Sequence, residues 1–335
     1  MSAQPAPLLE LRGASKRFVK TLDAAARIAN LLGASARDEV VHAVDQVDLA
    51  VQAGEVVGLV GESGCGKSTL ARLAVGLLEP SVGARLWRGE AVAALPAEKR
   101  RAIQLKIQMI FQDPYASLNP RMRVADIVGE APLVHGLIMQ SEQREYVAQL
   151  LARVGLDASL ARRFPHQFSG GQRARVGIAR ALAVKPEFLV CDEAVAALDV
   201  SIQAQVLNLF IQLREQFKLT YLFISHDLGV VQHISDRVLI MYLGRVVEAA
   251  RTGDIYARAN HPYTQALLAE VPRLDLRRKN FISISGEISS PLAPPPGCHF
   301  HPRCPHAMPK CRIEQPALRE IAPLHFSACH LNDIA

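Results

Sequence analysis

Residues 61–69 restrict the possible folds of this 335-residue chain more than any other feature. They read GESGCGKST and match the pattern G-x-x-x-x-G-K-[ST] in full. A compact β-branched run, Val56–Val60, precedes them and predicts a buried strand, and residues 68–78 follow with the apolar spacing of a helix. Strand, glycine-rich loop and helix in this order predict an α/β fold with a phosphate site. The alternative is a glycine-rich turn that carries a lysine by chance.

Each residue type in this loop suits a phosphate group. Three glycines let the backbone curl so that successive N–H groups face the anion, and the helix adds its positive N-terminal end. Lys67 is expected to reach the β- and γ-phosphates of a nucleotide, and the Ser68 hydroxyl to bind Mg²⁺. We expect nine consecutive residues to contact the nucleotide: Gly61, Glu62, Ser63, Gly64, Cys65, Gly66, Lys67, Ser68 and Thr69.

A second apolar run, FLVCDE at residues 188–193, ends in two acids. An apolar strand that delivers Asp192 at its end suits a carboxylate that organises Mg²⁺. Glu193 would then lie beside the γ-phosphate and act as general base on the attacking water. Alone, such a run often marks only the end of a strand. With the phosphate loop upstream, it predicts a nucleotide-hydrolysing site.

Regular patterns elsewhere indicate strands separated by helices, which predicts an α/β core with a largely parallel sheet. Residues 202–217 trace an amphipathic helix, and residues 115–163 form a helix-rich segment. An Ala-rich insert at residues 22–37 is expected to form a short helix. Further predicted strands lie at residues 8–11, 44–51 and 221–224, with a hairpin at 237–248 that turns at Gly244.

Length and composition favour two domains and a substantial core, because half the residues are hydrophobic. No apolar stretch reaches the roughly 18 residues that a membrane helix needs, and the N-terminus lacks the pattern of a signal peptide. We therefore expect a cytoplasmic protein whose membrane association comes through partners. The net charge of +6 fits nucleic acid, an anionic membrane, phosphate ligands or an ordinary basic enzyme.

Residues 168–182, FSGGQRARVGIARAL, resemble the signature sequence of ABC ATPases. Ser169 offers a hydroxyl, and Gly170 and Gly171 expose N–H groups at a helix N-terminus, with Gln172 next in the motif. The phosphate bound by the chain itself is expected at residues 61–69. The resemblance implies that two ATPases face head to tail, so that the Ser169 loop of one closes on the γ-phosphate held by the other.

Other elements resemble this family in the expected order. Gln112 in IFQDP matches the glutamine that senses Mg²⁺ and binds it, Asp199 in AALDVS matches the D-loop, and His226 in LFISHDL matches the histidine that contacts the γ-phosphate. Phe18 is the candidate for stacking on adenine, with packing against the small sheet as the alternative. Residues 194–196 read Ala-Val-Ala where the family commonly has Pro-Thr-Ser. This difference removes hydroxyl groups but keeps Glu193 and Asp199, so we expect it to affect the fine tuning of ATP hydrolysis and not the ability to hydrolyse ATP.

The chain looks like the branch of ABC ATPases that serves peptide and nickel importers, and most like its F-type subunits. Three segments carry this resemblance: GESGCGKST at residues 61–69, HPYTQALL at residues 261–268 and the tail at residues 294–311. It implies a P-loop ABC ATPase domain over residues 1–250, with an antiparallel β subdomain and a helical subdomain at about 115–165. Residues 251–335 would form a small Cys-rich extension, joined through an extended connector at 290–296.

The same resemblance implies an ATP-hydrolysing subunit at the cytoplasmic face of the inner membrane. It would drive a binding-protein-dependent importer of di- and oligopeptides, or of nickel or glutathione-like cargo. The expected partners are a D-type ATPase, two transmembrane permeases and an extracytoplasmic binding protein. The alternative is a soluble ABC ATPase that acts on nucleic acid. Such proteins usually carry two cassettes or a long coiled coil, and neither is present, so no nucleic-acid partner is expected.

Four cysteines crowd into the tail, and in a cytosolic chain they suggest a metal site before disulfides. No pair forms C-x-x-C, so neither a zinc ribbon nor a thioredoxin motif is matched. The family resemblance favours a [4Fe–4S] cluster, with Zn²⁺ or four free thiols as alternatives. The expected ligands are Cys298, Cys304, Cys311 and Cys329. The histidines that could compete with them are His299, His301, His306 and His330.

Overall fold

The central sheet follows from the continuous apolar runs of the sequence, which fit strands covered on both faces. The computed structural model describes residues 6–22, 30, 38–113, 117–270, 286 and 289–333. Among these residues, the central sheet has eight strands in the order β11-β12-β10-β9-β3-β8-β7-β6. The five strands from β9 to β6 run parallel, as predicted. The strands are β3 Val56–Val60, β6 Ile107–Ile110, β7 Phe188–Asp192, β8 Thr220–Ile224, β9 Arg237–Tyr242, β10 Arg245–Arg251, β11 Arg319–Ala322 and β12 His325–Ser327.

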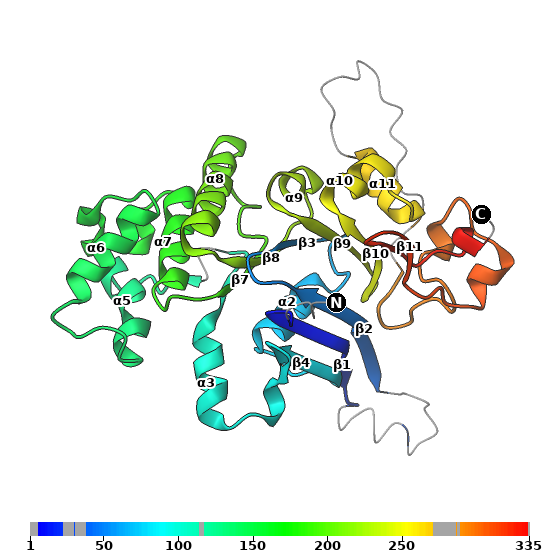
Figure 1. Cartoon of the computed structure of the whole chain (residues 1–335), viewed down its shortest axis with the longest axis horizontal. Coiled ribbons are helices and arrows are strands. Elements are labelled where there is room, and N and C mark those ends of the chain that lie inside the picture. The colour runs from blue at the N-terminus through cyan, green and yellow to red at the C-terminus, as the bar shows by residue number, and fades with distance from the viewer. Residues whose placement is uncertain are drawn as a thin grey trace, which may run out of the picture.

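Helices lie on both sides of this sheet (Figure 1). The predicted helix after the phosphate loop is α2, and it ends at Val75 because Gly76 takes a left-handed conformation (φ 82°) that donates its N–H back to the last turn. The predicted helix 202–217 is also present, as α8. The helices over and beside the sheet are α2 Lys67–Val75, α8 Val200–Phe217, α9 Leu228–Ile234, α10 Thr252–Arg258 and α11 Pro262–Glu270.

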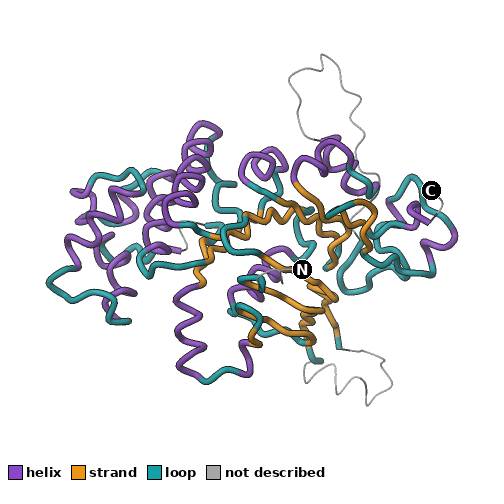
Figure 2. The backbone as a smooth tube through the Cα atoms, viewed as in Figure 1, coloured by secondary structure: helices purple, strands orange, loops and turns teal. Residues whose placement is uncertain are grey.

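A second, antiparallel sheet with the order β2-β1-β4-β5 packs below the first one (Figures 1 and 2). Its first two strands are longer than the short runs that predicted them, because polar residues continue the pairing beyond the apolar core. Of the insert predicted to be helical, only residues 22 and 30 belong to the described part. The elements are β1 Leu9–Lys20, β2 Glu39–Val51, β4 Val82–Trp87, β5 Glu90–Ala91, the 3₁₀ turn η1 Val92–Ala94 and α3 Ala97–Lys106.

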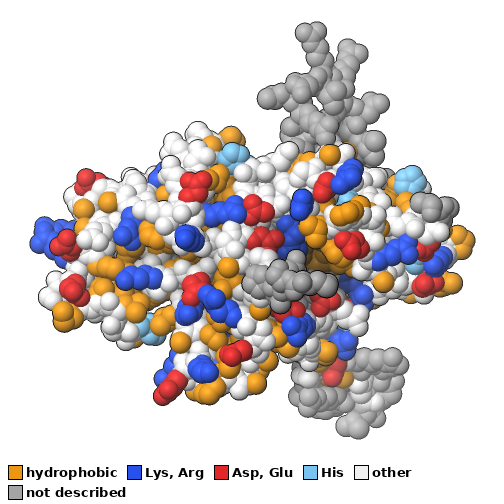
Figure 3. Space-filling view, viewed as in Figure 1, with side chains coloured by type: hydrophobic (Ala, Val, Ile, Leu, Met, Phe, Trp, Pro, Cys, Tyr) orange, Lys and Arg blue, Asp and Glu red, His pale blue; other side chains and the backbone are white. Residues whose placement is uncertain are grey.

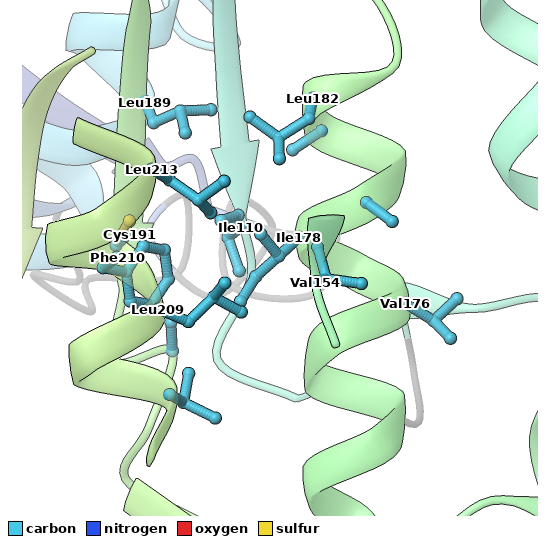
Figure 4. Close-up of a cluster of buried hydrophobic side chains, with 14 of the residues drawn as sticks. Ile110, Val154, Val176, Ile178, Leu182, Leu189, Cys191, Leu209, Phe210 and Leu213 are labelled. Atoms are coloured by element: carbon cyan, nitrogen blue, oxygen red, sulfur yellow. The ribbon is translucent and has the colours of Figure 1, made fainter. Parts of the chain in front are cut away.

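A group of helices forms the far end of the molecule from the tail (Figure 1). Apolar residues at helical spacing bury one face of each helix, and α7 joins the group although it lies beyond the predicted helical segment. Figure 4 shows Ile178 and Leu182 of α7 directed toward Leu209 and Leu213 of α8. Residues 114–116, at the predicted start of the segment, lie outside the described residues. The elements are α5 Val124–Val134, α6 Gln143–Arg153, η2 Ala158–Arg162, η3 Pro165–Gln167 and α7 Gly170–Leu182.

The Cys-rich tail joins the central sheet. Its strand β12 pairs antiparallel with β10, and Phe300 is fully buried against the rings of Tyr242 and Tyr263. The connector predicted to be extended instead turns at Pro291, where the Ala293 N–H donates to the Ser290 carbonyl (3.2 Å). The remaining elements are the 3₁₀ turns η4 His301–Arg303, η5 Pro309–Arg312 and η6 His330–Asp333.

Glu248 of β10 connects three parts of this region. Its carboxylate accepts hydrogen bonds from the backbone N–H groups of Asn260 (2.7 Å) and His261 (3.0 Å), and it lies 2.7 Å from Nε2 of His325 on β12. Glu248 is 0% exposed. A buried carboxylate of this kind is tolerated because every oxygen has a donor.

We expect Glu248→Ala to lower the free energy of unfolding by about 3–5 kcal/mol, because it leaves two buried N–H groups and an imidazole without their acceptor. Urea denaturation measures this change. The control is Glu215→Ala on the exposed face of α8, which should stay within about 0.5 kcal/mol of the parent chain. Equal denaturation midpoints for the two variants would show that Glu248 does not hold the tail to the sheet.

Candidate functional site

The phosphate loop leaves β3 and enters α2 at Gly66, which has φ 108°. No described side chain caps the start of α2, so its first N–H groups point toward the loop without a side-chain acceptor. A helix end in this state attracts an anion, because unpaired N–H groups and the helix dipole add together. The local structure therefore suits the phosphate group that the sequence pattern predicts at this loop.

Two of the loop glycines are required by close approach. A Cβ on Gly61 would lie 2.2 Å from the carbonyl oxygen of Met241, and a Cβ on Gly66 would lie 2.1 Å from that of Ala43. Both distances are shorter than any side chain tolerates, and each neighbour is backbone that cannot rotate away. The loop is thus packed between the end of β9 and strand β2.

Lys67 turns back over its own loop. Its side chain is buried, and Nζ donates to the carbonyl oxygens of Gly61 (2.8 Å) and Glu62 (3.0 Å). The next residue, Ser68, donates from Oγ to Oδ1 of Asp192 at 3.1 Å. Burial raises the pKa of Asp192, and the hydrogen bond from Ser68 offsets part of that rise. The hydroxyl and the carboxylate form an oxygen pair of the kind that Mg²⁺ prefers, so these residues fit that ion.

Three predicted catalytic side chains meet at the carboxyl ends of parallel strands. Oε2 of Glu193 accepts a hydrogen bond from Nε2 of Gln112 (2.7 Å), and Oε1 lies 3.5 Å from Nδ1 of His226. These residues follow β7, β6 and β8. Glu193 has φ 48°, an uncommon conformation for a residue with a side chain, and its N–H donates to the carbonyl of Ile224 (3.0 Å). Strained backbone of this type clusters at functional sites.

A pocket of about 440 Å³ opens beside this group. Phe18 is 41% exposed and lines the pocket, so its ring is available to a ligand. The connector residue Pro291 also lines it, and its carbonyl accepts from the N–H of His42 (3.2 Å). Sequence reasoning did not identify Pro291, and no local motif marks it. The lining residues are Phe18, Val41, Ala43, Ser63, Gly64, Gly66, Lys67, Ser68, Thr69, Gln112, Glu193 and Pro291.

The signature residues lie outside this pocket. Ser169 caps α7, where its Oγ accepts from the N–H of Gln172 (3.3 Å) and the Gln172 side chain accepts from the N–H of Ser169 (3.1 Å). A Cβ on Gly171 would lie 2.4 Å from Cγ2 of Ile202, which places this loop beside the start of α8 and its N-cap residue Asp199. Among the described residues, neither segment lines the pocket.

The Ala-Val-Ala segment after Glu193 has a structural role. Ala194 and Val195 are buried and belong to the same core as α7 and α8. The turn closes through a hydrogen bond from the Ala196 N–H to the Glu193 carbonyl (3.1 Å). Apolar packing therefore occupies the positions where hydroxyl groups are common in the family.

The four tail cysteines lie within electrostatic range of one another, and all are free thiols. The N–H of Cys298 donates to the carbonyl of Cys311 (2.8 Å). The pKa of Cys298 is raised to about 11, mainly by burial and in smaller part by the neighbouring Cys311, Cys329 and Cys304. The pKa values of Cys304 and Cys329 are raised in the same way. Yet no set of three His, Cys, Asp or Glu side chains in the described ranges is arranged to hold a metal ion.

Two of the four expected competing histidines have other partners. Nδ1 of His301 lies 2.9 Å from the carbonyl of Cys298, and the ring of His330 contacts Asp333 and the carbonyl of Glu314. Burial lowers the pKa of His299, which lines a separate cavity between β2 and the tail.

Three features define a nucleotide-binding cassette of the ABC type. They are a phosphate loop at the end of the parallel strand β3, an acidic pair at the end of β7, two strands away, and a capped signature helix outside the pocket. Residues 44–196 match the ABC transporter family, and residues 247–311 match the oligopeptide/dipeptide transporter C-terminal region. Within the described residues, no helix has both the length and the apolar character to cross a membrane.

Relatives with curated descriptions resemble the chain along most of its length. It is 52% identical over 296 residues to the oligopeptide transport ATP-binding protein AppF of Bacillus subtilis (strain 168), covering 87% of this chain and 90% of that protein. It is 47% identical to the probable peptide ABC transporter ATP-binding protein y4tS of Sinorhizobium fredii, covering 87% and 83%. The chain belongs to the family of ATP-binding proteins of oligopeptide/dipeptide ABC transporters.

Solved structures share the fold. A dimeric, post-hydrolysis structure of the ATP-binding cassette MJ0796 with ADP and Pi has a TM-score of 0.61 at 27% identity, covering 73% of this chain and 98% of that one. The cbiO1 protein of Clostridium perfringens, part of the transporter complex cbiONQ, also has a TM-score of 0.61, at 25% identity, covering 76% and 92%. The cassette fold and its ATPase class are thereby confirmed.

Proposed function

We propose that this chain hydrolyses ATP to drive a binding-protein-dependent importer of di- and oligopeptides, with nickel or glutathione-like compounds as other candidate cargo. The convergence of Gln112 and His226 on Glu193, beside the phosphate loop, carries the proposal, because it is an arrangement for hydrolysis. The peptide-transporter region at residues 247–311 supports the cargo class. The cassette would comprise residues 1–250, with a helical subdomain at about 115–165. The C-terminal extension would comprise residues 251–335.

The chemistry follows from the positions of these side chains. The loop N–H groups and Lys67 would bind the β- and γ-phosphates, while Phe18 would stack on the base. When bound, Mg²⁺ would supply charge neutralisation at the phosphates, held by Ser68 and Asp192 with Gln112 beside it. Glu193 would accept a proton from the attacking water at a carboxylate oxygen, and His226 would contact the γ-phosphate.

The signature patch supports a second ATPase as partner. Five signature and D-loop residues do not line the pocket of their own chain and would instead complete the site of another cassette: Ser169, Gly170, Gly171, Gln172 and Asp199. We favour a related D-type subunit over an identical copy. The two MJ0796 structures, both described as dimeric, support pairing of cassettes in general.

The transporter assembly would also include two membrane permeases and an extracytoplasmic binding protein. The chain would then lie at the cytoplasmic face of the inner membrane, held there by the permeases. On the face in Figure 3, basic and acidic side chains are interspersed, and this face does not resemble the continuous basic surface that nucleic acid binds.

Glu193→Gln should lower kcat for ATP hydrolysis by about 10²–10⁴-fold and leave ATP binding intact, because the amide cannot accept the proton of the attacking water. Phosphate release and equilibrium nucleotide binding measure the two effects. Glu215→Gln, on the exposed face of α8, is the matched control and should keep normal activity. Unchanged hydrolysis in Glu193→Gln would exclude Glu193 as the general base.

A tagged chain purified from gently solubilised native membranes should carry two multi-span proteins and a second ABC ATPase, with the binding protein among the recovered species. Mass spectrometry identifies them, and the tag alone serves as control. Recovery of a second ATPase of different sequence would establish the heterodimer, whereas recovery of this chain as the sole ATPase would establish the homodimer. Recovery solely in the soluble fraction with nucleic acid would contradict the transport proposal.

We further propose that the four tail thiols bind a [4Fe–4S] cluster, with Zn²⁺ as the alternative. Their mutual proximity and free state support a shared ligand, and the short tail has little core of its own apart from Phe300. The side chains as placed are not arranged for a metal, so binding would require them to rotate toward one another.

Anaerobically purified protein should show broad visible absorbance and contain iron and sulfide, and Cys304→Ser should remove both, because it deletes one of four thiolate ligands. Metal analysis distinguishes iron from zinc. Cys65→Ser, a thiol outside the cluster, should leave the metal content unchanged. Colourless wild-type protein without zinc would contradict the metal proposal.

A further inference from the structure

Glu62, the second residue of the phosphate loop, is held from three directions. Its N–H donates to the hydroxyl of Tyr263 (2.9 Å), and its carbonyl accepts from Nζ of Lys67 (3.0 Å). Its carboxylate accepts two hydrogen bonds from Arg303. Glu62 itself does not line the described pocket, and neither do Tyr263 and Arg303, whereas Lys67 does.

The pair between Arg303 and Glu62 has the geometry of a strong interaction. Nη1 of Arg303 lies 2.7 Å from Oε2, and Nη2 lies 2.9 Å from Oε1, so the guanidinium binds both oxygens in a fork. The Arg303 side chain is 4% exposed and that of Glu62 is 20% exposed, which limits screening by water. The guanidinium also lies 5.8 Å from the centre of the Tyr242 ring.

Arg303 belongs to the tail and is 241 residues from Glu62 in the sequence. It ends the turn η4, which begins directly after Phe300. Phe300 packs its ring against Tyr242 and Tyr263, with centroids 5.3 Å apart in both pairs. The tail therefore reaches the phosphate loop through one ion pair that is fixed by a rigid aromatic cluster.

We propose that Arg303 is a positioning residue through which the C-terminal extension sets the conformation of the phosphate loop and thereby the affinity for ATP. A glycine-rich loop must lose conformational freedom when its N–H groups align on phosphates, and this loss of entropy opposes binding. Fixing Glu62 in advance removes part of that cost. Arg303 also neutralises a carboxylate near the site where the polyanion binds. The inference rests on the proposed nucleotide site at residues 61–69.

Two variants that conserve charge test this proposal in the full-length chain. Arg303→Lys keeps the positive charge but loses the fork, and Glu62→Asp keeps the negative charge but shortens the reach. Each should raise the Kd for MgATP and the KM for hydrolysis about tenfold, with kcat within about twofold, because the loop is less well ordered before binding. The matched control is Arg312→Lys, an exposed arginine of the same extension, which should match the wild type.

Binding of MgATP is measured by calorimetry, and thermal melting checks that each variant is folded. If Arg303→Lys does not fold, Glu62→Asp decides the question, because it leaves the tail unchanged. Wild-type affinity in the folded variants, or a change in kcat without a change in Kd, would overturn the positioning role. A wild-type chain that fails to bind MgATP would instead refute the nucleotide site itself, so the two failures are distinguishable.

Discussion

The rest of the structure depends on the close approach of the phosphate loop to the backbone carbonyls of Met241 and Ala43. The first carbonyl belongs to the central sheet and the second to the small antiparallel sheet, so the loop marks the place where the two sheets converge. Glycine is the only residue that fits at both contacts. The position of the phosphate loop is therefore fixed by the packing of two sheets, and the acids at the end of β7, which β8 separates from β3, are placed relative to it.

Much of the core could be predicted because its signals are local. The run at Val56–Val60 and the helix at residues 202–217 show their burial in residue type and periodicity alone. The convergence of Gln112, Glu193 and His226 also follows, since parallel strands end at the same edge of a sheet. The apolar spacing predicts a helix that extends to residue 78, but Gly76 closes α2 at Val75.

The contribution of the tail could not be predicted from local patterns. Pro291 and Arg303 reach the phosphate loop or its pocket only because the extension folds back over the core, and no spacing in the sequence encodes that contact. The strands β11 and β12 were missed because residues 319–327 mix polar and apolar side chains without clean alternation. The proline-rich connector suggested extension, but a single backbone hydrogen bond closes it into a turn.

The pairing of β12 on β10 has a consequence for how this sheet meets the solvent. Strand β10 carries buried apolar residues, and without the tail its free N–H and C=O groups would form an open edge of the kind on which sheets of different molecules associate. The tail covers that edge and ends in β11, a strand of only four residues that begins with Arg319 and Glu320. Short length and charge discourage further strand addition. The extension thus keeps the sheet from aggregating, and a cassette truncated after β10 would lose that protection even with its ATP motifs intact.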